Sequence, residues 1–216
     1  MENKFELTDN FIINAFGVKL FQIKCTKSFK YAKEGDLGGY VEKDENLDQE
    51  SDAWVSGDAR VYGDARVYGD AWVSGDARVY GDARVYGDAR VSGDAWVSGN
   101  ARVSGDARVS GDAWVSGNAR VYGDAWVSGN ARVYGDAEID NNNKHCGFDC
   151  FGSANRHTHA YLTKENKVEI TCGCFHGSIE EFEKRVEETH SGTIYEKQYK
   201  AIIDVIKIKF GLTDLI

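Results

Sequence analysis

The sequence predicts a mainly β protein whose central part is a parallel β-solenoid, a chain wound into stacked coils. Two observations lead to this fold class. A six-residue phrase of the type Ala-x-Val-x-Gly-Asp repeats from residue 51 to residue 140 almost without interruption, and such a strict period is the signature of a repeat architecture. The chain also contains no proline, as expected when nearly every backbone N–H pairs with a neighbouring coil.

Each repeat is predicted to form a short strand followed by a corner. Alanine and valine stand two residues apart, as in Ala53 and Val55, so both side chains point to one face of an extended chain. The Arg or Trp and the Ser or Tyr point to the other face. Glycine permits the backbone angles of a tight corner, and the Asp or Asn that follows tolerates it. The repeat therefore predicts an aliphatic interior and an aromatic or polar exterior.

The pattern resembles the hexapeptide repeats of left-handed parallel β-helices, in which three repeats make one triangular coil. This resemblance implies the left hand and, for the fifteen repeats present, about five coils. At roughly 4.8 Å per coil the β-helix would be about 24 Å tall. Burial of each valine is worth roughly 1.5–3 kcal/mol before the conformational entropy of the chain is subtracted.

Three domains are expected, with the β-helix at residues 51–140. Residues 1–50 contain alternating apolar stretches and a Gly-rich bend. Because the first coil of a solenoid exposes unpaired strand and apolar interior, this segment is predicted to be an N-terminal β cap.

Residues 141–216 are predicted to form a C-terminal α+β domain, a β-hairpin plus two helices. The hairpin strands are expected at residues 160–163 and 167–172. Ser178 and Glu181 form a capping box that starts the first helix, and a second apolar-periodic segment follows it.

Segments in all three parts together resemble proteins encoded by phages and prophages of Gram-positive bacteria. They are Gly35-Asp36-Leu37-Gly38-Gly39, the GDARVY and GDAWVS repeats, Phe151-Gly152-Ser153, Cys172-Gly173-Cys174-Phe175-His176-Gly177 and Glu180-Glu181-Phe182. The resemblance implies little mechanism. Hexapeptide β-helices often associate side by side, so it also implies a homo-oligomer, with a trimer favoured.

Composition excludes several classes of partner. The formal net charge is -9, and no segment is basic enough for general nucleic-acid binding. No apolar run is long enough to cross a membrane, and the first residues do not form a signal peptide. The odd number of cysteines, 5, favours a reducing compartment. We therefore expect a protein of the bacterial host cytoplasm.

Sorting the repeats by threes assigns their outward side chains to three faces. One face carries a row of arginines with tyrosines beside it: Arg66, Arg84, Arg102, Arg120, Tyr68, Tyr86 and Tyr122. Arginines spaced about 4.8 Å apart and interleaved with tyrosines could grip an anionic or planar partner. The alternative interpretation is structural: the flanking Asp corners neutralise each arginine, which stacks on its neighbours.

The C-terminal segment contains the remaining candidate binding residues, which are Arg156, His157, His159, Cys172, Cys174 and His176. Cys146-x3-Cys150 and Cys172-x-Cys174 could form two halves of a zinc site. Their spacing is not that of a zinc ribbon, and residues 172, 174 and 176 of one strand would share one face, which is typical of packing. We expect no metal ion, no cofactor and no catalytic residue.

These observations favour a non-enzymatic binding protein, in which a rigid β-helix presents the C-terminal domain to a host or viral protein. Antagonism of a host defence system is one such role. The first alternative is sequestration of a nucleotide-like anion at the Arg/Tyr face or near the C-terminal domain. The second is an acyltransferase-like enzyme, which usually needs a histidine in its cleft; residues 51–140 contain no histidine, no cysteine and no inserted loop.

Overall fold

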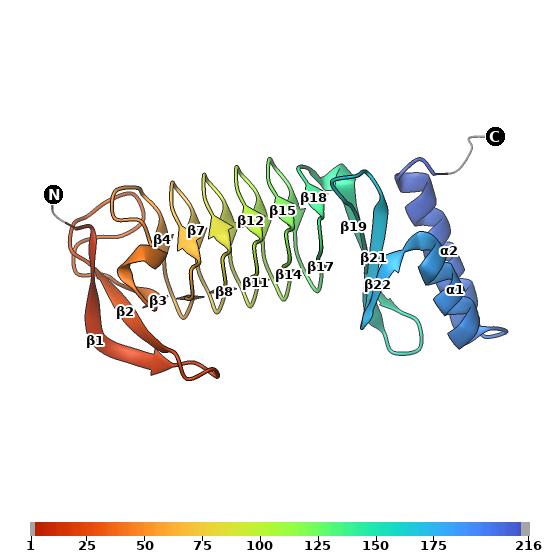
Figure 1. Cartoon of the computed structure of the whole chain (residues 1–216), viewed down its shortest axis with the longest axis horizontal. Helices are drawn as coiled ribbons and strands as arrows, with labels where there is room; N and C mark the ends of the chain where they lie inside the picture. The colour runs from red at the N-terminus through yellow and green to blue at the C-terminus, as the bar shows by residue number, and fades with distance from the viewer. Residues whose placement is uncertain (1–2, 213–216) are drawn as a thin grey trace.

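The repeats form a parallel β-solenoid, as the sequence predicts (Figure 1). The computed structural model describes residues 3–212. A two-residue strand recurs every six residues: β4 (Trp54–Val55), β5 (Arg60–Val61), β6 (Arg66–Val67), β7 (Trp72–Val73), β8 (Arg78–Val79), β9 (Arg84–Val85), β10 (Arg90–Val91), β11 (Trp96–Val97), β12 (Arg102–Val103), β13 (Arg108–Val109), β14 (Trp114–Val115), β15 (Arg120–Val121), β16 (Trp126–Val127), β17 (Arg132–Val133) and β18 (Glu138–Ile139).

Each strand pairs in parallel with the strand three repeats further on, so three repeats make one coil. Three sheets result. The arginine sheet has the order β18-β15-β12-β9-β6. The aromatic sheet continues from the N-terminal strand β3 (Leu37–Val41) in the order β3-β5-β8-β11-β14-β17. The third sheet has the order β16-β13-β10-β7-β4. The left hand of the coil stays a prediction from the resemblance.

The interior of the solenoid is a continuous column of alanine and valine. From Ala53 to Ile139, every Ala and Val of the column is at most 2% exposed. The corner glycines from Gly57 to Gly135 have φ between 61° and 73°, a left-handed conformation that side chains other than glycine adopt at a cost. The two-residue period of the strand and the glycine corners thus explain the coil.

The number of coils differs from the prediction of about five, because an irregular coil precedes the repeats. Strand β3 (Leu37–Val41) pairs in parallel with β5, with Val41 beside Val61, and Leu47 forms a parallel bridge with Val67. The solenoid therefore has about six turns. This coil lacks the six-residue phrase. Its backbone passes close to the repeats at Gly38, where a Cβ would lie 2.6 Å from the carbonyl oxygen of Val55.

The N-terminal segment covers the first coil with an antiparallel hairpin, β1 (Phe5–Ile13) and β2 (Lys19–Cys25). The 3-10 turn η1 (Asp44–Asn46) follows β3. Phe5, Ile23 and Cys25 are fully buried in the same core as the alanine and valine column. Hydrophobic contacts thus close this end of the solenoid.

The C-terminal domain is a four-stranded antiparallel sheet with two helices. The strands are β19 (His145–Phe151), β20 (Arg156–Leu162), β21 (Val168–Cys172) and β22 (Phe175–Ser178), and the helices are α1 (Ile179–His190) and α2 (Ile194–Lys209). A short 3-10 turn, η2 (Asn142–Lys144), leads into β19. No helix within residues 3–212 has the length and hydropathy needed to cross a bilayer.

The predicted hairpin corresponds to β20 and β21, whereas β19 and β22 were not predicted. Strand β19 contains glycine at 147 and a register shift between Phe148 and Phe151, so its sequence lacks a clean two-residue period. The predicted capping box is present: Ser178 Oγ accepts from the backbone N–H of Glu181 at 3.3 Å. The same glutamate accepts from the backbone N–H of Ser178 at 2.8 Å.

The C-terminal sheet lies between the solenoid and the helices (Figure 1). One face, which includes Ala160 and Ile170, packs on Phe182 and Ile203 of the helices. The other face contacts the last coil, and Tyr161 from this face is fully buried in the solenoid core. The C-terminal domain therefore closes the second end of the solenoid.

Candidate functional site

The arginine sheet aligns its four arginines in register. Arg66 pairs with Arg84, Arg84 with Arg102, and Arg102 with Arg120 across neighbouring parallel strands. Glu138 follows Arg120 in the same column. All four arginines are exposed. The sorting of repeats by threes predicted this column correctly, because three repeats make one coil.

The arginines of this column form no ion pair with the Asp corners in the described part of the chain. In every ion pair between described residues, the cation is a lysine or a histidine. Two corner carboxylates do pair, but with lysines: Asp64 with Lys43 and Asp70 with Lys30, both at 2.8 Å. The structural interpretation of the arginines is therefore wrong in its ion-pair part, and four aligned guanidinium groups face solvent.

Two of the three predicted tyrosines lie together. The rings of Tyr68 and Tyr86 stack with centroids 4.9 Å apart and an interplanar angle of 0°, and burial raises the pKa of the Tyr68 phenol. Tyr122 lies apart because Ser104 occupies the intervening coil. Its hydroxyl donates to Glu138 Oε1 at 3.0 Å, and burial together with this carboxylate raises its pKa.

Acidic residues border the arginine column at its N-terminal end. An open groove of about 620 Å³ lies between the 44–50 segment and the first coils. Its charged lining residues are Arg66, Arg84, Asp44, Glu45, Asp48 and Glu50. The sequence shows these carboxylates as an acidic run, but their place beside the arginines depends on the irregular first coil. A partner that crosses this groove meets both signs of charge.

The aromatic sheet differs from the arginine sheet in its outward side chains. Rings follow one another along it, with centroid distances of 5.1, 6.3, 5.3, 5.9 and 5.8 Å in the order Tyr62, Tyr80, Trp96, Trp114, Tyr134 and His176. The guanidinium of Arg78 lies 4.8 Å from the ring of Trp96, a cation–π geometry. This row of rings is a packed surface that continues into the C-terminal domain.

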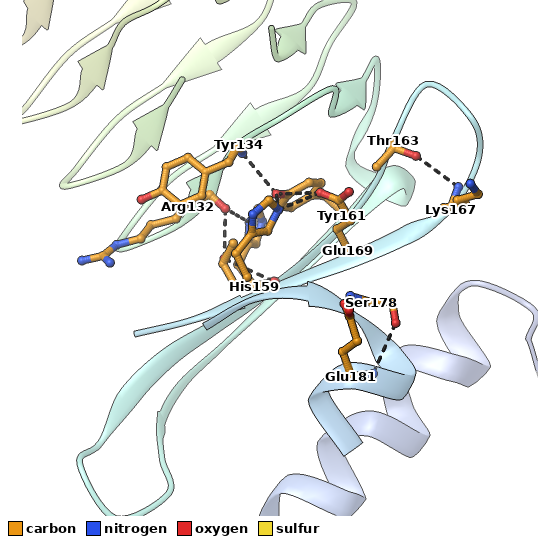
Figure 2. Close-up of polar contacts among 11 residues, drawn as sticks. Arg132, Tyr134, His159, Tyr161, Thr163, Lys167, Glu169, Ser178 and Glu181 are labelled. Carbon is orange, nitrogen blue, oxygen red and sulfur yellow. Dashed lines mark hydrogen bonds and ion pairs between the residues drawn. The ribbon is translucent and has the colours of Figure 1, made fainter. Parts of the chain in front are cut away.

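Polar contacts attach the C-terminal sheet to β17 (Figure 2). The carbonyl oxygen of Arg132 accepts from His159 Nδ1 at 3.2 Å and from Thr171 Oγ1 at 3.0 Å. A carbonyl can only accept, so Nδ1 of His159 carries the hydrogen, and its Nε2 accepts from His145 Nδ1 at 3.1 Å. The guanidinium of Arg132 also donates to the carbonyl of Gly173 at 2.9 Å.

A second group of contacts surrounds the buried ring of Tyr161. Its hydroxyl accepts from the backbone N–H of Tyr134 at 3.2 Å and lies 3.4 Å from Glu169 Oε2. His176 Nε2 lies 2.8 Å from the same carboxylate oxygen and 3.1 Å from the Tyr161 hydroxyl. Burial raises the pKa of Tyr161, so its phenol stays protonated. His176 therefore has a structural partner in Glu169.

Burial keeps two histidines of this junction neutral. Desolvation lowers the pKa of His159 to about 3 and the pKa of His145 to about 4. His157 lies at the edge of the group, with Nδ1 2.6 Å from Asp149 Oδ1. Of the candidate histidines, His159 and His176 thus contact the last coil of the solenoid, whereas His157 pairs with Asp149 within the C-terminal domain.

The cysteines are dispersed, and the expectation that residues 172, 174 and 176 share one face is wrong. Gly173 (φ 60°) and Cys174 form the turn between β21 and β22. The chain reverses there, so Thr171, not Cys172, is the cross-strand partner of His176. Cys172 faces the helices and Cys174 is exposed. Among residues 3–212, no three His, Cys, Asp or Glu side chains gather closely enough to hold a metal ion.

Comparison with known proteins supports the repeat architecture. A family model described as the YdcK β-solenoid repeat matches residues 53–69, 59–75, 77–93, 83–99, 101–117 and 113–129. All six matches lie within the solenoid and together cover less than half of the chain. A comparison with curated proteins found no match. The chain is therefore a β-solenoid repeat protein similar to this family in its repeats.

Proposed function

We propose that this chain is a non-enzymatic binding protein whose solenoid holds the arginine sheet and the C-terminal domain in a fixed arrangement toward a macromolecular partner. The observation that carries the proposal is the arginine column: four guanidinium groups in register, exposed, and without a carboxylate of residues 3–212 within ion-pair distance. Aligned like charges repel one another, so an anionic partner would relieve this repulsion and form charge-assisted hydrogen bonds.

The attachment of the C-terminal domain supports the scaffold part of the proposal. Tyr161 is buried in the solenoid core and Arg132 contacts both β20 and the β21–β22 turn. A domain fixed by buried groups cannot pivot freely relative to the solenoid. A partner can therefore contact both surfaces without ordering a linker, which lowers the entropic cost of binding.

We propose a protein with an acidic surface as the partner, from the host or from a virus. The resemblance to phage and prophage proteins supports a role in the bacterial cytoplasm, and antagonism of a host defence system is the role we favour. Side-by-side association of three solenoids is the favoured oligomer under the same resemblance. Multiple copies would present several arginine sheets to one partner and increase avidity.

A second candidate function is sequestration of a nucleotide-like anion. The stacked pair Tyr68 and Tyr86 beside Arg66 and Arg84 favours it, because planar bases stack on aromatic rings and arginines bind phosphate. The carboxylates of Asp44, Glu45, Asp48 and Glu50 in the same groove oppose a polyanion there. Titration with AMP and ATP, followed by calorimetry, separates this function from protein binding.

The test compares two pairs of arginines on neighbouring faces of the same coils. Arg84→Gln with Arg102→Gln removes the middle of the arginine column, and Arg90→Gln with Arg108→Gln removes an exposed, aligned pair from the third sheet. The two arginines of each pair lie on adjacent coils, and each double variant removes two positive charges. The two variants should therefore fold alike and have the same net charge. Native mass spectrometry of protein purified from a bacterial host identifies the partner, and poly-L-glutamate serves as a defined acidic probe.

The proposal predicts that the first double variant binds the partner or probe at least about tenfold more weakly than the second. Equal affinities of the two variants would remove the arginine sheet from the binding surface. A retained nucleotide in the purified protein, with no bound protein, would favour the second candidate function.

A further inference from the structure

A pocket in the C-terminal domain has no role in the function proposed above. It encloses about 280 Å³ between the sheet and the helices, on the face of the sheet that packs against α1 and α2. Side chains from β20, β21, β22, α1 and α2 line it, among them Arg156, Cys172, Phe175, Phe182, Arg185 and Tyr199. It therefore lies on the opposite side of the sheet from the junction with the solenoid.

The inner wall of the pocket is aromatic. The ring of Phe182 lies 5.0 Å from Phe175 and 5.7 Å from Tyr199, measured between centroids. His190 stacks on Tyr199 at 5.4 Å with an interplanar angle of 25°. Flat apolar rings at these positions suit a ligand that is itself planar.

The two charged side chains that line the pocket are both cationic. Arg156 and Arg185 line it, and no Asp or Glu among residues 3–212 does. Neither arginine takes part in an ion pair within the described part of the chain. The side chain of Arg156 lies across Gly173, where a Cβ would come within 2.5 Å of its Nη1. The glycine of the turn thus makes room for this guanidinium.

Tyr199 supplies a buried polar group that lacks a good partner. The residue is 5% exposed, and the only hydrogen-bond contact of its hydroxyl among residues 3–212 is the Cys172 sulfur at 3.9 Å. Sulfur is a weak acceptor, and Cys172 already accepts from Thr158 Oγ1 at 3.3 Å. Buried hydroxyl groups usually have a partner, and this hydroxyl also packs against Gly152, where a Cβ would clash with it.

We propose that this pocket binds a compact planar anion, an aromatic ring that carries one carboxylate or one phosphate. The ring packs on Phe182 and Tyr199, and the anionic group lies between the two guanidinium groups. The volume is just below the range of about 300–1,000 Å³ typical of drug-sized ligands, which favours a single ring. This site does not depend on the arginine sheet or on a macromolecular partner.

Titration of the full chain with defined probes tests the ligand class. Benzoate and phenyl phosphate carry a ring and an anion, whereas cyclohexanecarboxylate is not planar, benzyl alcohol is uncharged and inorganic phosphate has no ring. We expect benzoate or phenyl phosphate to bind with a dissociation constant below about 1 mM, and each control to bind at least about tenfold more weakly. The two ring-bearing probes distinguish carboxylate from phosphate.

A matched pair of variants on α1 locates the site. Arg185→Gln removes a guanidinium of the pocket, and Lys184→Gln removes the adjacent cation, which lines only the neighbouring groove that Arg185 also borders. Loss of a charge-assisted hydrogen bond predicts about tenfold weaker binding for Arg185→Gln and an unchanged dissociation constant for Lys184→Gln. Both residues are exposed, so both variants should fold.

Cysteine alkylation provides an independent measurement on the unaltered protein. Cys174 is exposed and lines the pocket, whereas Cys150 is exposed elsewhere in the same domain. We expect the bound probe to slow iodoacetamide labelling of Cys174 and not of Cys150. Failure of both ring-bearing probes to bind at millimolar concentration would overturn the proposal, as would binding that leaves Cys174 labelling and the Arg185→Gln affinity unchanged.

Discussion

The arginine sheet and the aromatic sheet arise from the same repeat but differ in what their outward side chains contact. On the aromatic sheet, rings from Tyr62 to Tyr134 contact one another and reach His176 of the C-terminal domain. On the arginine sheet, the four arginines from Arg66 to Arg120 face solvent and form no ion pair with any described residue. Both faces share one alanine and valine interior, so the repeat supplies stability from inside and leaves the outer positions free to differ.

This difference separates a structural face from a candidate binding face. Packed rings bury apolar area and stiffen the solenoid along its length. Unpaired guanidinium groups contribute little to stability, because exposed charges interact weakly through water. Substitutions on the aromatic side and at the junction that it reaches should therefore change stability, whereas substitutions on the arginine sheet should change binding.

The largest expected loss of stability follows Tyr161→Ala at the junction. The change empties a fully buried site at the end of the valine column and removes the hydroxyl partner of the Tyr134 N–H. We expect the free energy of unfolding to fall by about 3–5 kcal/mol. Tyr86→Ala, at a half-buried ring of the arginine sheet, is the control and should cost about 1 kcal/mol. Chemical denaturation measures both, and equal losses would contradict the assigned role of Tyr161.

Trp114→Ala tests the row of rings itself. Trp114 contacts Trp96 at 5.3 Å and Tyr134 at 5.9 Å between centroids, so its loss leaves a gap within the row. We expect a cost of about 2 kcal/mol. The matched control is Trp126→Ala on the third sheet, where the residue is 53% exposed and its loss should cost under about 1 kcal/mol. A larger effect at Trp126 would show that the row adds no stability.

Stability should fall as the pH is lowered through the range in which free histidine titrates. The pKa of His159 is about 3 in the folded chain against about 6.5 when unfolded, so the unfolded state binds a proton first. The stabilising contribution is complete above about pH 6.5 and is lost as the pH falls toward the folded pKa. Each such histidine contributes a slope that approaches about 1.4 kcal/mol per pH unit well below pH 6.5.

His159→Gln isolates this effect, because glutamine keeps hydrogen-bonding capacity without titrating in this range. Unfolding free energies at pH 6.5 and pH 5.5 should differ by about 1 kcal/mol less in the variant than in the unaltered chain. Identical pH dependence of the two proteins would mean that His159 is not held neutral by burial.

The sequence was sufficient for features that depend on the repeat alone. The period of six and the glycine corners predicted the strands from Trp54 to Ile139, the three faces and the arginine column. The capping box was also predicted, because its two residues, Ser178 and Glu181, lie close together in the sequence.

Features that depend on contacts between distant residues could not be predicted. The irregular first coil has no six-residue phrase, so neither Val41 beside Val61 nor the acidic groove was foreseen. Nothing local to Tyr161 shows that its ring enters the solenoid core, and the reversal at Gly173 moved Cys172 and His176 to opposite faces. The pocket at Arg156 and Arg185 likewise brings together residues from five elements.

Substitutions at Arg84 and Arg102 should have the smallest effect on stability. The same two residues give the most direct test of the arginine sheet as the binding face. Chemical modification by phenylglyoxal, read at each arginine by mass spectrometry, compares the faces in one sample of the full chain. We predict rapid modification of Arg84 and Arg102, strong protection of both by poly-L-glutamate, slow modification of the half-buried Arg78, and rapid but unprotected modification of Arg90 and Arg108. Equal protection of Arg90 and Arg108, or none at Arg84 and Arg102, would contradict the assignment of the arginine sheet as the binding face.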